Sequence, residues 1–142
     1  MLYTLITKWE GCRLTAYKCS AGIDTIGYGN TTYPDGSKVK PGDVITQTYA
    51  EALLKDYVER NICPLFTKIP YKLTTGQQAA IASLVYNVGA SAFLNSKLYT
   101  AICERDLKEI CRQWDWFTAG GKVLKGLVKR RVEELYFFVR DL

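Results

Sequence analysis

Glycines and turn signals crowd into one short part of this chain, and their uneven placement constrains the fold more than any other feature. Five of the eleven glycines lie between Gly11 and Gly36, where they separate short runs of β-forming residues. After residue 45 the pattern changes, because apolar residues recur there at helical spacing. We therefore expect an α+β fold in which a small strand-bearing lobe adjoins a larger helical lobe.

The first 45 residues are predicted to form one helix followed by strands and turns. Leu2, Leu5, Ile6 and Trp9 stand at helical spacing, so we expect a helix over residues 2–10 that ends before Gly11. Strand and turn are expected over 17–30, followed by a return strand over 38–45 that Pro41-Gly42 interrupts.

The second half is predicted to be helical. Thr46 is a suitable N-cap for a long helix that ends near Asn61 and connects the two regions. Thr75 is the expected cap of a helix running to about Gly89, which is apolar on nearly all sides and so belongs at the centre of a bundle. Further helices are expected over 97–104, 106–116 and 127–138.

The last predicted helix carries charge next to its apolar residues. Its apolar stripe consists of Val128, Val132, Leu135 and Val139. Arg131 falls inside that stripe, whereas Arg130 is expected to point the opposite way. A buried Arg needs an acidic partner. Arg131 either pairs with Glu134 or reaches solvent, or it orients Glu10 or another carboxylate of a site.

Composition excludes several kinds of chemistry. The chain has no His, which removes Ser-His-Asp and Cys-His nucleophile schemes and the commonest metal ligand. Five Cys is an odd number without zinc-type spacing, so we expect most of them to be buried small hydrophobes. A disulfide among Cys12, Cys63, Cys103 and Cys111 stays open, and Cys19 is treated separately below.

The net charge of +5 suits an anionic partner. Single-stranded nucleic acid is one alternative, but basic residues cluster only at 129–131 and no nucleic-acid motif is present, so we expect no nucleic-acid binding. No run reaches the ~18 apolar residues of a membrane helix. The first residues lack the basic and apolar regions of a signal peptide, and we expect no membrane insertion.

Two residues are candidates for chemistry by their position alone. Glu10 lies at the end of the first helix, where partial burial and the negative end of the helix dipole both favour a protonated carboxyl group, as a general acid requires. A solvated Glu at a helix end is the alternative. Thr25 lies on the strand face opposite Asp24, where its hydroxyl could hold a water molecule.

The spacing of these residues is more specific than any one of them. Glu10, Cys19 and Thr25 follow the pattern Glu, eight residues, Asp or Cys, five residues, Thr. The surrounding segment EGCRLTAYKCSAGIDTIGYGNT closely resembles the phage-type lysozymes, glycoside hydrolase family 24. The likeness continues through the segments 39–46, 50–54, 84–89, 92–93 and 120–131.

This resemblance implies a fold and an activity. The fold would be one lysozyme domain over 1–142, with a β-hairpin lobe at about 12–45. Residues 1–11 and 46–142 would form the helical lobe and the long connecting helix, with a cleft between the lobes. The activity would be that of an endolysin, hydrolysing the β-1,4 bond between N-acetylmuramic acid and N-acetylglucosamine in peptidoglycan and so lysing the host cell. The resemblance implies no metal and no cofactor, and we expect a monomer.

The family also implies roles for single residues. Glu10 would be the general acid, Cys19 stands where most relatives have Asp, and Thr25 would position water. Asn87, Tyr28 and Arg131 are the expected substrate-binding residues. Cys19 could act as a base or as a nucleophile, which leaves the stereochemical outcome open.

Two departures and one alternative follow from the comparison with the family pattern. Asn30 replaces the usual His, and Asp24 replaces an aromatic or aliphatic residue. The Asp-to-Cys change at Cys19 allows a catalytically inactive lysozyme-like scaffold or binding protein. For the active enzyme, we expect residence in the host cytoplasm until a holin-type partner releases it to the periplasmic cell wall.

Overall fold

The computed structural model describes residues 1–116, 118–119 and 122–142. Its first element is helix α1 (Thr4–Glu10). The helix predicted over 2–10 is thereby confirmed, and Leu5 and Ile6 are its buried residues. It ends because Gly11 adopts a φ of +66°, a left-handed conformation that glycine takes without a steric penalty. The Gly120-Gly121 part of the last family-like segment lies outside the described residues.

The chain divides into two compact units. One comprises Ile6–Asn61, and the other comprises Met1–Leu5 together with Ile62–Leu142. The prediction of a single lysozyme domain with a β-containing lobe at about 12–45 stays a prediction.

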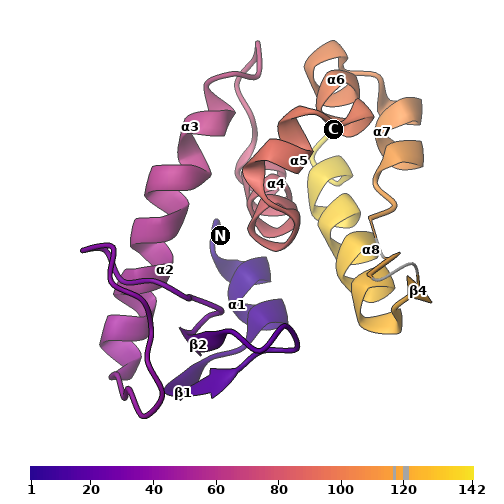
Figure 1. Ribbon diagram of the computed structural model, residues 1–142. Helices are drawn as coiled ribbons and strands as arrows, with labels where there is room; N and C mark the ends of the chain where they lie inside the picture. The colour runs from indigo at the N-terminus through magenta and orange to yellow at the C-terminus, as the bar shows by residue number, and fades with distance from the viewer. Residues whose placement is uncertain (117, 120–121) are drawn as a thin grey trace. The chain divides into compact units, whose positions relative to one another are not determined.

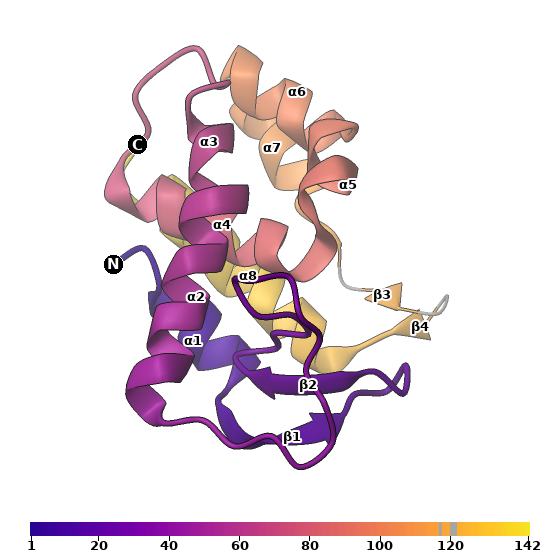
Figure 2. The same ribbon diagram turned by 60° about the vertical axis from the view of Figure 1, so that its left-hand side comes forward.

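The first unit is built on a β-hairpin. Strands β1 (Arg13–Lys18) and β2 (Asp24–Gly27) pair antiparallel, with Tyr17 opposite Thr25 (Figure 2). The return strand predicted over 38–45 is wrong, because this stretch forms only isolated bridges, from Lys38 to Thr32 and from Val44 to Thr15. Pro41 has no amide hydrogen for a ladder, and Gly42 has a φ of +87° within a turn.

Helix α2 (Gln47–Asn61) completes this unit and packs against β2 (Figure 2). Its predicted cap is confirmed, because the Thr46 hydroxyl accepts the Tyr49 N–H at 3.1 Å. The helix also ends at the predicted residue. It buries one apolar stripe, formed by Ala50, Leu53, Leu54 and Val58.

The second unit is helical. Helix α4 (Thr75–Val88) lies beside α8 (Lys125–Val139) (Figure 1). Thr74 rather than Thr75 caps α4, through a capping box with Gln77. The predicted central position of α4 is confirmed by its nine buried residues. The remaining elements are α3 (Cys63–Phe66), α5 (Ala90–Leu94), α6 (Lys97–Glu104), α7 (Leu107–Gln113), β3 (Thr118–Ala119) and β4 (Lys122–Val123). Within the described residues, none of the helices is long and apolar enough to cross a membrane.

The apolar stripe predicted for the last helix is only partly buried, although Arg131, which was placed inside it, is buried. Val132 is 64% exposed, and the buried residues of α8 are Arg130, Arg131, Glu134 and Phe138. Arg130 therefore does not point away from the core, as predicted, but donates to the Ser83 carbonyl and hydroxyl at 3.0 and 3.1 Å. Polar residues replace apolar ones here because they satisfy one another's hydrogen bonds inside the unit.

Close packing between α4 and α8 depends on Gly76. A Cβ atom there would lie 2.6 Å from the Phe137 carbonyl oxygen and 2.9 Å from Asp141 Oδ2. Because the first of these atoms is backbone, we expect Gly76→Ala to separate the helix ends and to lower the free energy of unfolding by about 1–3 kcal/mol. Urea denaturation measures this change. Gly126→Ala is the matched control, since a Cβ there meets nothing within 4 Å, and equal losses for both variants would contradict the expectation.

Candidate active site

Glu10 is half-buried at the last residue of α1. A Cβ atom built on Gly29 would lie 3.7 Å from Glu10 Oε2, so the backbone that follows β2 approaches the carboxyl group. Gly29 has a φ of +92°, which favours glycine at this point of approach. The carboxyl group therefore lies against the turn that carries the Gly-Tyr-Gly sequence.

That turn is closed by a pair of backbone hydrogen bonds. Ile26 N–H donates to the Asn30 carbonyl at 2.8 Å, and Asn30 N–H donates to the Ile26 carbonyl at 2.9 Å. Asn30 is 8% exposed, and its Oδ1 atom has no hydrogen-bond partner within the described residues. The side chain that stands in place of the family's His is thus enclosed by the turn.

Cys19 directly follows β1 and lies partly exposed in the hairpin turn. The backbone amides of Ile23 and Ala21 donate to its sulfur and lower the pKa of the thiol below its ordinary value of 9.0. Burial acts in the opposite direction, and the Thr25 hydroxyl adds a further lowering. Because hydrogen bonds to the charged form favour it, this turn supports a thiolate.

Thr25 is 3% exposed, and its hydroxyl donates to the Ile23 carbonyl at 2.9 Å. A hydroxyl has one hydrogen, so it serves either this carbonyl or the Cys19 thiolate, and its lone pairs remain acceptors. Asp24 forms an ion pair with Lys18 at 3.0 Å. Thr25 is thus buried, whereas the neighbouring Asp24 lies in an ion pair at the surface. This agrees with the prediction that the two residues occupy opposite faces of the strand.

Tyr28 is buried within the same turn. Its hydroxyl accepts a hydrogen bond from Gln47 Nε2 at 3.0 Å, and Gln47 Oε1 accepts one from the Cys12 thiol at 3.6 Å. The first residue of α2 therefore holds the ring of Tyr28 in place.

The other two predicted residues belong to the second unit. Asn87 is exposed near the end of α4. Arg131 is 1% exposed, with its Nε atom 2.7 Å from Glu134 Oε1, so pairing with Glu134, one of the three alternatives, is confirmed. The structure thus gathers Glu10, Cys19, Thr25 and Tyr28 into one compact unit.

The thiols differ from expectation. All five Cys are free, four are partly exposed and Cys111 is exposed, so the prediction that most are buried is wrong. Cys63, Cys103 and Cys111 lie on helices, whereas Cys12 and Cys19 directly precede and follow strand β1. Among the residues that the structure describes, no group of three or more Cys, Asp and Glu side chains could hold a metal ion.

Three contributors to this site were not predicted. They are the amides of Ala21 and Ile23 at the sulfur, the backbone of Gly29 at the carboxyl group and the amide side chain of Gln47 at Tyr28. The Ser20-Ala21-Gly22 turn could have pointed to the first, because a tight turn after a strand directs its N–H groups inward. Gln47 carried no sequence signal, since its contact joins residues 19 positions apart.

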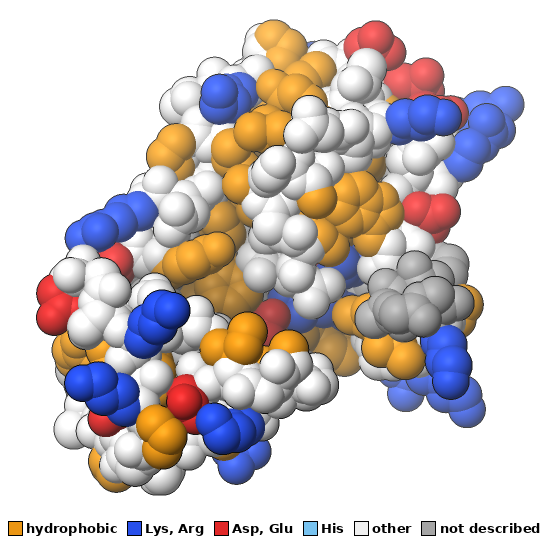
Figure 3. All heavy atoms as spheres, viewed as in Figure 1, with side chains coloured by type: hydrophobic (Ala, Val, Ile, Leu, Met, Phe, Trp, Pro, Cys, Tyr) orange, Lys and Arg blue, Asp and Glu red, His pale blue; other side chains and the backbone are white. Residues whose placement is uncertain are grey.

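Basic charge forms no single patch on the visible face of the molecule (Figure 3). Lys and Arg side chains are scattered over the face seen in Figure 3, with hydrophobic and acidic side chains between them.

Comparison with known proteins gives consistent similarities. Residues 7–134 match the family described as "Phage lysozyme". The endolysin of Acyrthosiphon pisum secondary endosymbiont phage 1 is 40% identical over 139 residues, covering 94% of this chain and 92% of that protein. The SAR-endolysin of Bacteriophage PS119 is 41% identical, covering 88% of this chain and 73% of that protein. The solved endolysin from Escherichia coli O157:H7 phage FAHEc1 superposes with a TM-score of 0.86 at 31% identity, over 98% of this chain and 90% of that chain.

Proposed function

Because this chain belongs to the phage lysozyme family, whose members degrade peptidoglycan, we propose that Glu10, Cys19 and Thr25 carry out the hydrolysis. The bond cut is the β-1,4 linkage between N-acetylmuramic acid and N-acetylglucosamine. One observation carries the assignment. The same compact unit contains the half-buried carboxyl group of Glu10 and the thiol of Cys19, whose pKa is lowered.

Glu10 acts as the general acid. Its proton passes to the glycosidic oxygen as the bond to the anomeric carbon breaks, so the leaving sugar departs as a neutral alcohol. The support is local: the side chain is half-buried, and the Gly29 backbone lies on one side of it.

Cys19 supplies the second group that glycoside hydrolysis needs. As a base, its thiolate takes one proton from a water molecule while the oxygen of that water bonds to the anomeric carbon. As a nucleophile, its sulfur bonds to the anomeric carbon, and water then displaces it. The first course inverts the anomeric configuration and the second retains it. Proton NMR of the sugar product formed in the first minutes distinguishes them.

Thr25 positions the attacking water. Its hydroxyl hydrogen is engaged by the Ile23 carbonyl or by the thiolate, and its lone pairs therefore accept a hydrogen bond from water. This orients the water oxygen toward the sugar.

The three proposed substrate-binding residues differ in access. Asn87 is exposed and can bond directly to a sugar hydroxyl or acetamido group. Tyr28 and Arg131 are buried, so their share in substrate binding is proposed to come through the groups that they hold in place.

The state of Cys19 leads to a prediction. Cys19→Ser is expected to lose about a hundredfold in activity, because a serine hydroxyl does not ionise near neutral pH, whereas Cys19→Asp stays active because a carboxylate replaces the thiolate. Turbidity clearing of Gram-negative cells with a permeabilised outer membrane measures both variants. Equal activity of Cys19→Ser and the parent would remove Cys19 from the mechanism.

The same prediction has a direct chemical readout. Because the pKa of Cys19 is lowered, its alkylation by iodoacetamide should reach half-maximal rate below pH 9.0 and should abolish activity. Thr25→Val removes one donor to the sulfur, so it should move this midpoint upward. Peptide mass spectrometry locates the label. An enzyme that stays active with Cys19 fully labelled would contradict the assignment.

The function is tested by mass spectrometry of digested, purified peptidoglycan. Fragments that carry reducing N-acetylmuramic acid ends support a muramidase. Intact glycan strands, with the chain still folded and bound to the sacculus, would favour the inactive scaffold.

Release into the cell wall is a separate proposal. We expect the protein to wait in the host cytoplasm until a holin-type partner opens the inner membrane, as the similarity to proteins named endolysin suggests; a protein named SAR-endolysin is similar as well. Expression in host cells with and without a holin tests this route, and lysis at the same rate in both would overturn it.

A further inference from the structure

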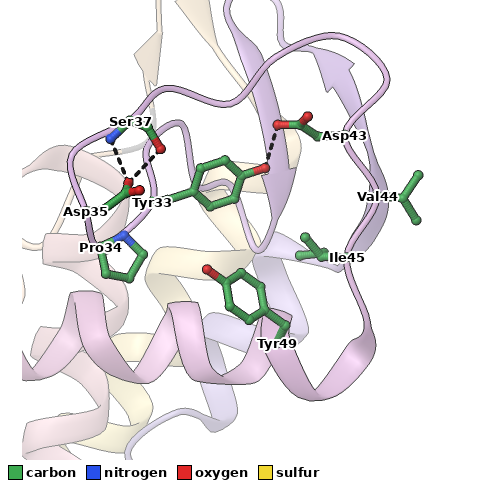
Figure 4. A pocket seen from close by; sticks show the side chains of 8 residues that line it. All are labelled: Tyr33, Pro34, Asp35, Ser37, Asp43, Val44, Ile45 and Tyr49. Carbon is green, nitrogen blue, oxygen red and sulfur yellow. Dashed lines mark hydrogen bonds between the residues drawn. The ribbon is translucent and has the colours of Figure 1, made fainter.

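A pocket lies in the unit Ile6–Asn61, among residues to which no role has been given (Figure 4). Its volume is about 500 Å³, within the range of pockets that hold small ligands. It opens between the turn at 33–37, the segment 43–45 and the first turn of α2. The lining residues are Tyr33, Pro34, Asp35, Ser37, Asp43, Val44, Ile45 and Tyr49.

Two carboxylates line this pocket, and each accepts hydrogen bonds on one of its two oxygens. Asp43 Oδ2 accepts the Tyr33 hydroxyl at 2.7 Å and the Lys40 N–H at 2.9 Å. Asp35 Oδ1 accepts the N–H and the hydroxyl of Ser37 at 2.9 and 2.6 Å. None of the other labelled lining residues hydrogen-bonds to the second oxygen of either carboxylate (Figure 4).

These contacts also decide which role each group can play. The hydrogen bonds from Tyr33 and Ser37 lower the pKa values of Asp43 and Asp35, respectively. Burial, with the hydrogen bond and charge of Asp43, raises the pKa of Tyr33 to about 12. At neutral pH the carboxylates are therefore ionised acceptors and Tyr33 is a protonated donor. A ligand has to bring hydrogen-bond donors.

The rest of the lining is apolar and open. The rings of Tyr33 and Tyr49 lie 6.4 Å apart at 49°, next to Pro34 and Ile45 (Figure 4). Tyr49 is 42% exposed and Val44 is 71% exposed. The Tyr49 hydroxyl has no hydrogen-bond partner in the part of the chain that the structure describes. The pocket thus offers an exposed aromatic surface beside fixed acceptors.

We propose that this pocket binds a neutral sugar ring of a glycan strand. A pyranose has a C–H face, which packs on tyrosine rings, and a rim of hydroxyl and acetamido N–H groups, which donate to carboxylates. An anionic ligand is excluded because the two ionised carboxylates repel it. An isolated ammonium group would fill little of a 500 Å³ space and would compete with Lys40, which already lies close to Asp43.

The choice of a peptidoglycan strand as the natural source of this sugar rests on the proposed function. A second point of attachment on the same unit as Glu10 would keep the enzyme on an insoluble strand between successive cuts. Its loss should therefore raise KM on intact sacculi and leave kcat unchanged.

The experiment uses the full chain carrying Glu10→Gln, so that the probe is not consumed. The probe is the pentamer of N-acetylglucosamine, titrated while the backbone amide shifts of residues 33–49 are followed by NMR. We expect saturable shifts there. Tyr49→Ala should weaken this binding by about tenfold, because it removes the exposed ring, while Tyr49→Phe, which keeps the ring, should retain most of it.

Tyr136→Ala is the matched control, because Tyr136 is another exposed tyrosine and lies outside the pocket. Shifts confined to residues outside 33–49, or equal effects of Tyr49→Ala and Tyr136→Ala, would overturn the proposal. So would binding of the deacetylated, cationic glucosamine pentamer with none of the N-acetylated one. Failure of peptidoglycan digestion by the parent, with the pocket still titrating, would instead overturn the proposed function alone.

Discussion

Glu10→Gln is expected to slow peptidoglycan hydrolysis by about a thousandfold, within the 10²–10⁴ range of general acid catalysis. Gln has nearly the same shape as Glu but carries no acidic proton, so the leaving sugar would have to depart as an alkoxide. The change leaves the contact between α1 and the Gly29 turn in place, and the fold should therefore survive. Release of reducing ends from purified peptidoglycan measures the rate.

Glu59→Gln is the control for this variant, because Glu59 is an exposed residue of α2 whose ion pair with Lys55 is long, at 3.9 Å. It should keep parental activity. Urea denaturation of both variants shows whether a loss of rate reflects chemistry or unfolding. Full activity of a folded Glu10→Gln would show that another group donates the proton.

Glu134→Gln is expected to produce the largest loss of stability, about 3–5 kcal/mol in the free energy of unfolding. Glu134 is 0% exposed and pairs with Arg131 at 2.7 Å and Arg130 at 3.3 Å. It also accepts hydrogen bonds from Ser83 and from Trp114 Nε1. Glu134→Gln would leave the buried guanidinium groups of Arg130 and Arg131 without an anion. The free-energy cost of these two uncompensated buried charges exceeds the stability that the ion pairs themselves contribute.

The size of the stability loss in Glu134→Gln depends on whether Glu134 is ionised or neutral. Burial raises the pKa of its carboxyl group, while the charges of Arg131 and Arg130 and the hydrogen bonds from Ser83 and Trp114 act against that rise. An ionised carboxylate predicts the large loss, because Gln cannot replace its charge. A neutral carboxyl group predicts a small one. Urea denaturation decides, with Glu59→Gln as the exposed control, and a variant as stable as the parent would contradict the expectation.

Local chemistry explains why part of the site could be predicted. Glu10 ends the first helix because Gly11 follows it. The burial of Thr25 does not come from alternation between faces, because its strand neighbours Ile26 and Gly27 are buried as well. The family spacing of Glu10, Cys19 and Thr25 adds what local rules do not provide, namely that these three residues act together. The lowered pKa of Cys19 was not predicted, although the turn after β1 offered a signal for it, because it depends on where the amides of Ile23 and Ala21 point.

Errors arose where polar groups were assumed to face solvent. On α8, Arg130 was expected to point away from the stripe that contains Val128 and Val132, yet it is buried together with Arg131 and Glu134. Hydropathy ranks each side chain by its own cost of burial, whereas that cost falls when Ser83 on another helix supplies a partner. The absent strand at 38–45 has a different cause: Pro41 has no amide hydrogen and Gly42 lies in a turn, so pairing is reduced to the isolated bridges of Lys38 and Val44.

The class of fold, the longer helices and the likeness to the family could be predicted from the sequence, because each depends on spacing along the chain. The short helices α3 and α5 and the bounds of the paired strands could not. Tertiary contacts were needed to show which face of α8 is buried, how amides hold the Cys19 sulfur and that Tyr33, Asp43 and Tyr49 line a pocket. These features depend on atoms that are distant in sequence, and their energies are set by partners that no single segment contains.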